Sequence, residues 1–216
     1  EYVRRLGQGA EGTVYLVRAK ARGAGLYAMK VVKKRFSPED AERKIYRRLT
    51  RGRCNFISPL YDTFDYGDKL CVIVGYKPRG SLYGVLKQFW ALPHSIYQRH
   101  CRKTFFAYAM QIVDAVSNLH ADLILHRDIK PENILVDERG HIFLSDFGLA
   151  EDFSLRESPS PALLANDEIG TRGCLAALPC GTPGFSAPEI MLDSNPNAYG
   201  YETDWYSVGA TLFFMF

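Results

Sequence analysis

Several polar side chains lie close together in the stretch HRDIKPENIL, residues 126–135. It contains Asp128, Lys130 and Asn133 and ends in apolar residues, so we expect a loop that leads into a strand. A further carboxylate, Asp146, ends the next expected strand, in SDFG. Amide and carboxylate oxygens are the hard ligands that Mg²⁺ binds, so Asn133 and Asp146 are candidate ligands. The alternative is that Asp146 only forms a turn.

The sequence GQGAEGTV, residues 7–14, has the spacing G-x-G-x-x-G-x-V. Glycine lets backbone N–H groups approach a phosphate closely. A dinucleotide-binding turn carries the same glycines but needs a helix after the last one, whereas here a strand is expected. The pattern favours a loop that folds over phosphates inside a hairpin, and an ordinary flexible hairpin is the alternative.

One lysine, Lys30, lies within the apolar strand sequence YAMKVV. A lysine in the middle of a strand is often on the solvent face, but Ala28 and Val32 share the face of Lys30. A lysine kept among apolar side chains needs an anionic partner, because an unpaired buried charge is costly. Glu42 is the candidate, since it lies on the apolar side of the following expected helix, whereas Glu39 already has a basic residue at i+4.

The elements that position these residues change character along the chain. Strands are expected in 1–36, and a helix over 37–50 is expected to begin at Ser37 and Pro38. After that we expect strands over 56–64 and 69–76, helices over 81–89 and 103–120, a hairpin over 133–147 and a flexible segment over 154–180. Strands followed by helices predict an α+β fold with two lobes joined near residues 76–80.

The composition is that of an ordinary soluble globular protein. The chain has 216 residues, of which 47% are hydrophobic and 24% charged, and its net charge is +3. Nothing in this balance requires a nucleic acid or an anionic membrane. Five cysteines without a C-x-x-C pair argue against a zinc site or a disulfide framework. We therefore expect an intracellular location, cytoplasmic or nuclear, and for Cys174 and Cys180 either free thiols or a redox pair.

The two ends of the sequence also carry expectations. The chain begins at Glu1 without an apolar leader, and no apolar run approaches the roughly 20 residues of a membrane helix. It ends in GATLFFMF, inside an apolar run without a helix stop signal. We interpret this end as a helix that is cut.

Five motifs occur in a fixed order: G-x-G-x-x-G-x-V, A-M-K, H-R-D-x-K-x-x-N, D-F-G and A-P-E. With them the chain resembles the eukaryotic protein kinases over essentially its whole length. The resemblance implies a bilobal fold: residues 1–76 would be a β-rich nucleotide-binding lobe with one key helix, and 77–216 a mainly helical catalytic lobe. It implies ATP and Mg²⁺ as cofactors and proteins as substrates. In that family further helices follow, which agrees with a cut C-terminus.

The resemblance assigns roles to the loop residues. Asp128 would accept or orient the proton of the substrate hydroxyl, and Lys130 would neutralise the transferring phosphate. Thr182 would contact both of them. Asn133 would hold one Mg²⁺, and Asp146 would hold both ions.

The resemblance also assigns a nucleotide site. Lys30 would contact the α- and β-phosphates, with Glu42 fixing it, below the loop that contains Gly7, Gly9 and Gly12. The adenine slot would be lined by Leu6, Val14, Ala28 and Leu135, with Val74 as gatekeeper and Gly75–Tyr76 as hinge. A hydrophobic stack joining the lobes would consist of His126, Phe147, Tyr46 and Leu60.

The hydroxyl that accepts the phosphate is predicted to be serine or threonine. Lys130 in HRDIKPEN and Thr182 in GTPGFSAPE are similar to the Ser/Thr branch, and LYAMKVVKK, GTPGF and TDWYSVG resemble the AGC group of basophilic kinases. Glu132 could bind a basic substrate residue. Ser81 stands where many basophilic kinases have an acidic residue, which weakens the expectation of a strong arginine preference.

Regulation is expected to depart from the family pattern. The activation segment, residues 146–189, is long, and Arg127 would usually pair with a phosphate on it. The AGC-like position for that phosphate is Leu178, which cannot be phosphorylated. Two hypotheses follow: activity without phosphorylation, or control from the insertion, where Ser158 and Ser160 precede prolines.

Three functional hypotheses remain open at this point. The first is an active serine/threonine kinase, with an upstream kinase or regulatory protein as a further partner. The second is a non-catalytic kinase-like scaffold, since fold alone does not decide function. Degenerate members usually lose the lysine, the HRD aspartate or the DFG aspartate, and all three are present here. The third is an inactive fragment that lacks terminal helices.

Overall fold

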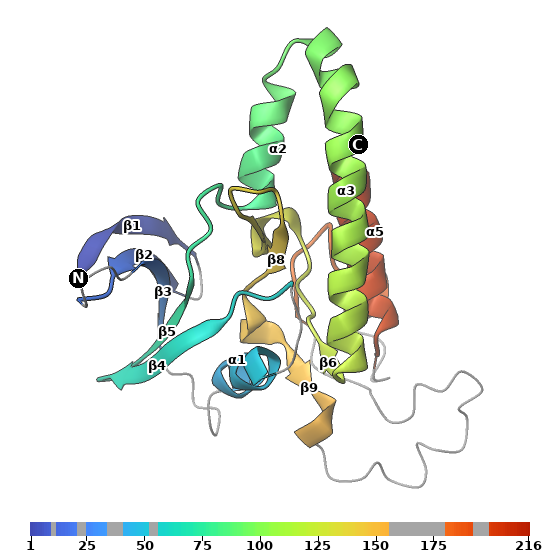
Figure 1. The fold of residues 1–216 in the computed structure, drawn as a ribbon. Helices are drawn as coiled ribbons and strands as arrows, with labels where there is room; N and C mark the ends of the chain where they lie inside the picture. The colour runs from blue at the N-terminus through green and yellow to red at the C-terminus, as the bar shows by residue number, and fades with distance from the viewer. Residues whose placement is uncertain (10–11, 21–24, 34–40, 52–55, 156–179, 192–198) are drawn as a thin grey trace, which may run out of the picture.

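A computed structural model describes most of the chain: residues 1–9, 12–20, 25–33, 41–51, 56–155, 180–191 and 199–216 (Figure 1). Several predictions lie outside these residues. They concern the helix start at Ser37 and Pro38, the phosphorylation of Ser158 or Ser160, the replacement at Leu178 and the thiol of Cys174.

The first third of the chain forms a five-stranded antiparallel sheet in the order β1-β2-β3-β5-β4. Its strands are β1 (Tyr2–Gln8), β2 (Gly12–Arg18), β3 (Leu26–Lys33), β4 (Leu60–Tyr66) and β5 (Lys69–Gly75). The strand predicted over 56–64 is shifted. It begins only after Pro59, which cannot donate a ladder hydrogen bond. Before it, Ile57 makes an isolated bridge to Leu144.

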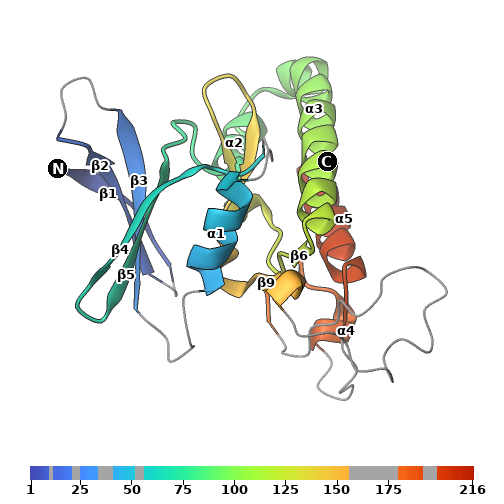
Figure 2. The same cartoon turned by 60° about the horizontal axis from the view of Figure 1, so that its bottom comes forward.

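One helix, α1 (Ala41–Arg51), lies between this sheet and the rest of the molecule (Figure 2). Ile45, Tyr46 and Leu49 recur at helical spacing and are buried. The predicted helix over 37–50 is therefore confirmed over its described part. Because α1 contacts β4 on one side and residues 147–149 on the other, it couples the sheet to the loops beyond it.

The second part of the chain is mainly helical, with α2 (Leu82–Trp90), α3 (His94–Ala121), α4 (Pro188–Met191) and α5 (Glu202–Met215). Figure 1 shows α3 and α5 side by side. The helix expected over 103–120 is present but starts earlier than expected. Pro93 ends a short link, and α3 already begins at His94. The polar stretch 94–103 lacks apolar periodicity, but extending an existing helix costs little once it is nucleated.

Short elements between α3 and α4 carry the polar loop. They are β6 (Ile124–Leu125), β7 (Ile134–Val136), β8 (Ile142–Leu144), β9 (Glu151–Asp152) and three 3-10 turns, η1 (Pro131–Asn133), η2 (Phe147–Leu149) and η3 (Phe153–Leu155). β7 and β8 form the predicted hairpin, and Gly140 in its turn has φ +83°, which favours glycine. β6 pairs with β9, so the polar loop that follows β6 lies next to the segment that follows β8.

The hydrophobic core runs through both parts. One buried cluster joins Ala28 and Val72 of the sheet, Tyr46 of α1, and apolar side chains of α2, α3, β7, β8 and α5. The predicted α+β fold with a strand-rich part and a helical part is confirmed, while the boundary after residue 76 stays a prediction. No helix within the described ranges has both the length and the apolar content to cross a bilayer.

Candidate active site

The polar loop is anchored to α5 by Asp204, which is fully buried. Its two carboxylate oxygens accept the backbone N–H groups of His126 at 2.8 Å and Arg127 at 2.9 Å. The Nε2 atom of His120 lies 2.9 Å from the same carboxylate. Buried N–H groups need such acceptors, because an unsatisfied one is costly. Sequence reasoning missed Asp204, although it lies in TDWYSVG, one of the stretches that resemble the AGC group.

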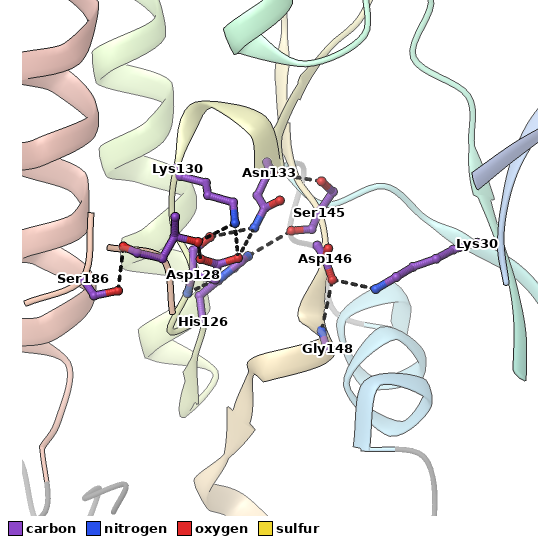
Figure 3. Close-up of polar contacts among 10 residues, drawn as sticks. Lys30, His126, Asp128, Lys130, Asn133, Ser145, Asp146, Gly148 and Ser186 are labelled. Atoms are coloured by element: carbon purple, nitrogen blue, oxygen red, sulfur yellow. Dashed lines mark hydrogen bonds and ion pairs between the residues drawn. The ribbon is translucent and has the colours of Figure 1, made fainter. Parts of the chain in front are cut away.

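Three side chains meet at the centre of the loop. Lys130 Nζ donates to Asp128 Oδ2 at 2.7 Å and to Thr182 Oγ1 at 2.6 Å, and Thr182 Oγ1 donates to Asp128 Oδ1 at 2.6 Å (Figure 3). Thr182 is 54 positions away from Asp128 in the sequence. The structure thus brings the three predicted residues into one hydrogen-bonded group, in which a carboxyl group lies beside an amino group.

Asn133 holds Asp128 of this group in place through hydrogen bonds. Its Nδ2 donates to the backbone oxygen and to Oδ2 of Asp128, both at 2.8 Å. The backbone oxygen of Asn133 accepts hydrogen bonds from Ser145 N at 2.9 Å and from Ser145 Oγ at 2.8 Å. Because Ser145 directly precedes Asp146, these bonds hold the two predicted Mg²⁺ ligands close together, one just before β7 and the other just after β8.

A second ionic group links the sheet, α1 and the loop after β8. Lys30 Nζ lies 3.0 Å from Glu42 Oε1, the predicted partner, and 2.6 Å from Asp146 Oδ1. Burial lowers the pKa of Lys30, but the two carboxylates outweigh it and the net pKa is raised. Burial raises the pKa of Asp146, and Lys30 overcomes this, so that the net pKa is lowered. Both groups are therefore charged at neutral pH.

The glycine-rich stretch contains glycines of two kinds. A Cβ atom on Gly12 would lie 2.2 Å from the carbonyl oxygen of Val31, so Gly12 is required by the packing of β2 against β3. A Cβ atom on Gly7 or Gly9 would meet no atom of the described residues within 4 Å. These two glycines leave open space above the backbone, where a phosphate could lie.

The apolar residues predicted for an adenine slot come together in part. Ala28 and Val74 are buried neighbours across β3 and β5, and Leu6 and Val14 pack against the same cluster. Leu135 is half-buried on β7 and bridges to Ser81. In the predicted hinge, Gly75 ends β5 and the hydroxyl of Tyr76 accepts a hydrogen bond from Arg4 at 3.4 Å.

Three of the four residues of the predicted hydrophobic stack are in ring contact. The ring of Phe147 lies 5.0 Å from that of Tyr46 on α1 and 5.1 Å from that of His126 in the polar loop. Leu60 of β4 packs against the same core. The stack connects the sheet side of the site to the loop side through apolar contacts.

The donor set fits Mg²⁺ bound together with phosphates. Asp146 supplies a carboxylate and Asn133 an amide oxygen, and the lowered pKa keeps the carboxylate charged. In the described part of the chain no group of three or more His, Cys, Asp or Glu residues could hold a metal by itself. A Mg²⁺ ion here would take its other ligands from phosphates and water, as is usual for this ion.

Two residues considered for substrate recognition have different surroundings. The hydroxyl oxygen of Ser81 accepts a hydrogen bond from Gly84 N at 3.3 Å and caps the N-terminus of α2. Glu132 is exposed beside the polar loop. Of the two, Glu132 is the one that stays accessible to a substrate.

Comparisons with known proteins agree with this geometry. The family described as "Protein kinase domain" matches residues 1–216. The chain is similar to Protein kinase 3 of Dictyostelium discoideum (34% identical), to the RAC serine/threonine-protein kinase of Drosophila melanogaster (34%) and to the human RAC-beta serine/threonine-protein kinase (32%). Each similarity covers 100% of this chain but only 22%, 31% and 40% of the respective relative.

Proposed function

This chain belongs to the protein kinase family, and on that premise we propose that it transfers the γ-phosphate of ATP to serine or threonine hydroxyls of protein substrates. The observation that carries the proposal is the hydrogen-bonded group of Asp128, Lys130 and Thr182. Phosphoryl transfer requires mainly positioning and charge neutralisation, and this group offers a proton acceptor beside a cation. The Ser/Thr kinase names of the relatives support the choice of hydroxyl, and their RAC names support an AGC-like kinase.

In the proposed reaction, Asp128 orients the substrate hydroxyl and takes up its proton. The hydroxyl oxygen forms a bond to the γ-phosphorus while the bond from that phosphorus to the β–γ bridging oxygen breaks, which leaves ADP. Lys130 neutralises charge on the phosphoryl group in transit. The N–H groups around Gly7 and Gly9 cover the phosphates from above.

The remaining residues bind the nucleotide. Lys30, held by Glu42, contacts the α- and β-phosphates and, when ATP is bound, exchanges its contact with Asp146 for them. Asn133 and Asp146 would hold Mg²⁺, which supplies neutralisation of the phosphate charge when bound. The apolar residues of the predicted adenine slot exclude water from the base. An intracellular location, where ATP is available, is part of the same proposal, as are protein substrates and an upstream regulator.

The test is transfer of labelled phosphate from Mg·ATP to a mixed pool of Ser, Thr and Tyr peptides, followed by phosphoamino acid analysis. Asp128→Asn is compared with Asp68→Asn, the same change at an exposed position of the β4–β5 turn. We expect phosphoserine or phosphothreonine, lost in the first variant and kept in the second. A folded protein that transfers no phosphate would instead support the scaffold hypothesis, and phosphotyrosine would refute the predicted hydroxyl.

A further inference from the structure

The short strand β9 consists of two consecutive acidic residues, Glu151 and Asp152. It pairs with β6 in the register Leu125–Glu151 and Ile124–Asp152. Successive side chains of a strand point to opposite sides, so the two carboxylates face different neighbours. Each of them meets an arginine, and the two arginines belong to different parts of the active site.

Glu151 faces the polar loop. Its Oε2 lies 2.9 Å from Nη1 of Arg127, whose side chain is only 11% exposed. The same guanidinium donates to the backbone oxygen of Leu149 at 2.6 Å and to the hydroxyl of Tyr199 at 3.4 Å. Arg127 directly precedes Asp128 and has φ +67°, a backbone conformation that its surroundings must hold in place. A buried guanidinium needs an anion, and here a carboxylate of the chain itself provides it.

Asp152 faces α1. Its Oδ1 accepts a hydrogen bond from Nη1 of Arg48, which also donates to the hydroxyl of Ser154 at 2.5 Å. The other Nη atom of Arg48 donates to the backbone oxygen of Asp122, at the end of α3. The side chain of Asp152 is 5% exposed. Arg48 therefore fastens the C-terminal half of α1 to β9 and to α3.

The same helix carries Glu42 in its first turn, and Glu42 pairs with Lys30 at 3.0 Å. A packed helix moves as a rigid body, so fixing Arg48 also fixes where Glu42 lies. β9 is thus connected through one acid to the residue before Asp128, and through the other to the helix that holds Lys30.

We propose that Glu151 and Asp152 are positioning residues that together align the catalytic loop and α1, so that this kinase needs no phosphate on residues 154–182. Phosphorylation of an activation segment usually acts by adding negative charge that arginines bind. In this chain the charges are encoded in β9 and already engage Arg127 and Arg48. The proposal rests on the proposed kinase function and selects the first of the two regulatory hypotheses.

The first experiment removes phosphate. The full-length protein is treated with phosphatase, mass spectrometry verifies that residues 154–182 carry no phosphate, and kcat and KM are measured with a Ser/Thr peptide. We expect kcat to stay within about twofold of the untreated enzyme, because β9 is unchanged by the treatment. A fall of about tenfold or more on dephosphorylation would overturn the proposal, since a phosphate would then be needed in addition to the two carboxylates.

The second experiment removes the charges one at a time, with Glu138→Gln as an exposed control. Glu151→Gln is expected to lower kcat about 10- to 100-fold with little change in the KM for ATP, because misplacing Asp128 affects transfer. Asp152→Asn is expected to raise the KM for ATP, because α1 and Lys30 shift. Glu151→Asp should recover part of the lost kcat. Substituting a residue that only stabilises the fold would lower the melting temperature without this separation of a kcat effect in Glu151→Gln from a KM effect in Asp152→Asn. Unchanged kinetics in both variants would refute the proposal.

Hydrogen exchange separates this proposal from the proposed function. In the nucleotide-free protein, Glu151→Gln should speed amide exchange in residues 126–130, and Asp152→Asn should do so in 41–51, whether or not the protein transfers phosphate. A wild-type protein without activity but with these exchange changes would refute the kinase function and leave the positioning role standing. If the wild-type protein is active but the variants change neither amide exchange nor kinetics, the kinase function is supported and the positioning role is refuted.

Discussion

The carboxylate of Asp204 accepts the backbone N–H of Arg127 at 2.9 Å, across 77 positions of the sequence. Its other oxygen accepts the N–H of His126, so one side chain of α5 fixes the backbone just before Asp128. Both N–H groups thus find their acceptors on α5, far along the chain from the loop. The geometry of the catalytic loop is in this way determined by a distant helix.

Replacing this carboxylate should loosen the loop. Asp204→Asn keeps the size but offers one acceptor oxygen where two are used, so one buried N–H group loses its partner. We expect a loss of about 2 kcal/mol in the free energy of unfolding and a lower kcat. Denaturant unfolding and peptide phosphorylation measure the two effects. Asp68→Asn at an exposed turn is the control, and equal stability of the two variants would contradict the anchoring role.

The lysine of β3 should matter for nucleotide affinity. Lys30→Met removes a cation that we place on the phosphates of ATP, and we expect Mg·ATP to bind about 10- to 100-fold more weakly, the equivalent of one or two charge-assisted hydrogen bonds. Lys33→Met, an exposed residue of the same strand, is the matched control. Glu42→Gln should have a smaller effect, because the lysine keeps its charge. Calorimetric titration with Mg·ATP measures the affinity of each variant. Similar affinities for Lys30→Met and Lys33→Met would exclude a contact between Lys30 and the phosphates.

Two alanine substitutions in the glycine-rich stretch should have opposite profiles. Gly12→Ala would place a methyl group 2.2 Å from the carbonyl oxygen of Val31. Overpacking of this kind costs about 1–3 kcal/mol, so thermal stability should fall. The methyl group of Gly9→Ala would meet none of the described residues within 4 Å, so this variant should keep its stability nearly unchanged while it binds nucleotide more weakly. Thermal unfolding with and without Mg·ATP distinguishes the two, and a large stability loss in Gly9→Ala would show that its open space has another use.

Stability should depend on pH through Asp146. Its pKa is lowered in the folded protein, so the ionised carboxylate contributes stability above its unfolded pKa, and this contribution is lost as the pH falls through the folded pKa. The pKa of Lys30 is raised, so its contribution is complete below the unfolded value of about 10.5 and is lost only at more alkaline pH. Between about pH 5 and pH 9 the pair should therefore add no pH dependence.

Melting temperatures of wild type and Asp146→Asn, measured from pH 3 to pH 9, check this expectation. Below about pH 4 the melting temperature of the wild type should fall relative to that of Asp146→Asn, whatever their difference at neutral pH. The reason is that only the wild type takes up a proton at this site. A difference that stays constant down to pH 3 would contradict a lowered pKa of Asp146.

The sequence motifs predicted the site residues more completely than the local residue patterns predicted the helices and strands. Strands with alternating apolar residues and the hairpin around Gly140 were found where they were expected. The start of β4 was misplaced, because Pro59 cannot donate a ladder hydrogen bond and the strand begins only after it. Residues 94–103 were misassigned, because the helical state of a polar stretch depends on the helix that it extends.

The sequence by itself determined which side chains are available: the carboxylate, ammonium, amide and glycine groups in an order typical of one family. It also determined the Lys30–Glu42 pair, since a lysine on an apolar strand face needs an acid and the next helix offers one. The family resemblance, rather than any local pattern, predicted that Thr182 meets Asp128. Only the tertiary structure decided that Asp204 holds the loop, and that Glu151 and Asp152 reach two different arginines. Such contacts join residues far apart in the chain, and their partners are set by how helices and strands pack, which local residue patterns do not encode.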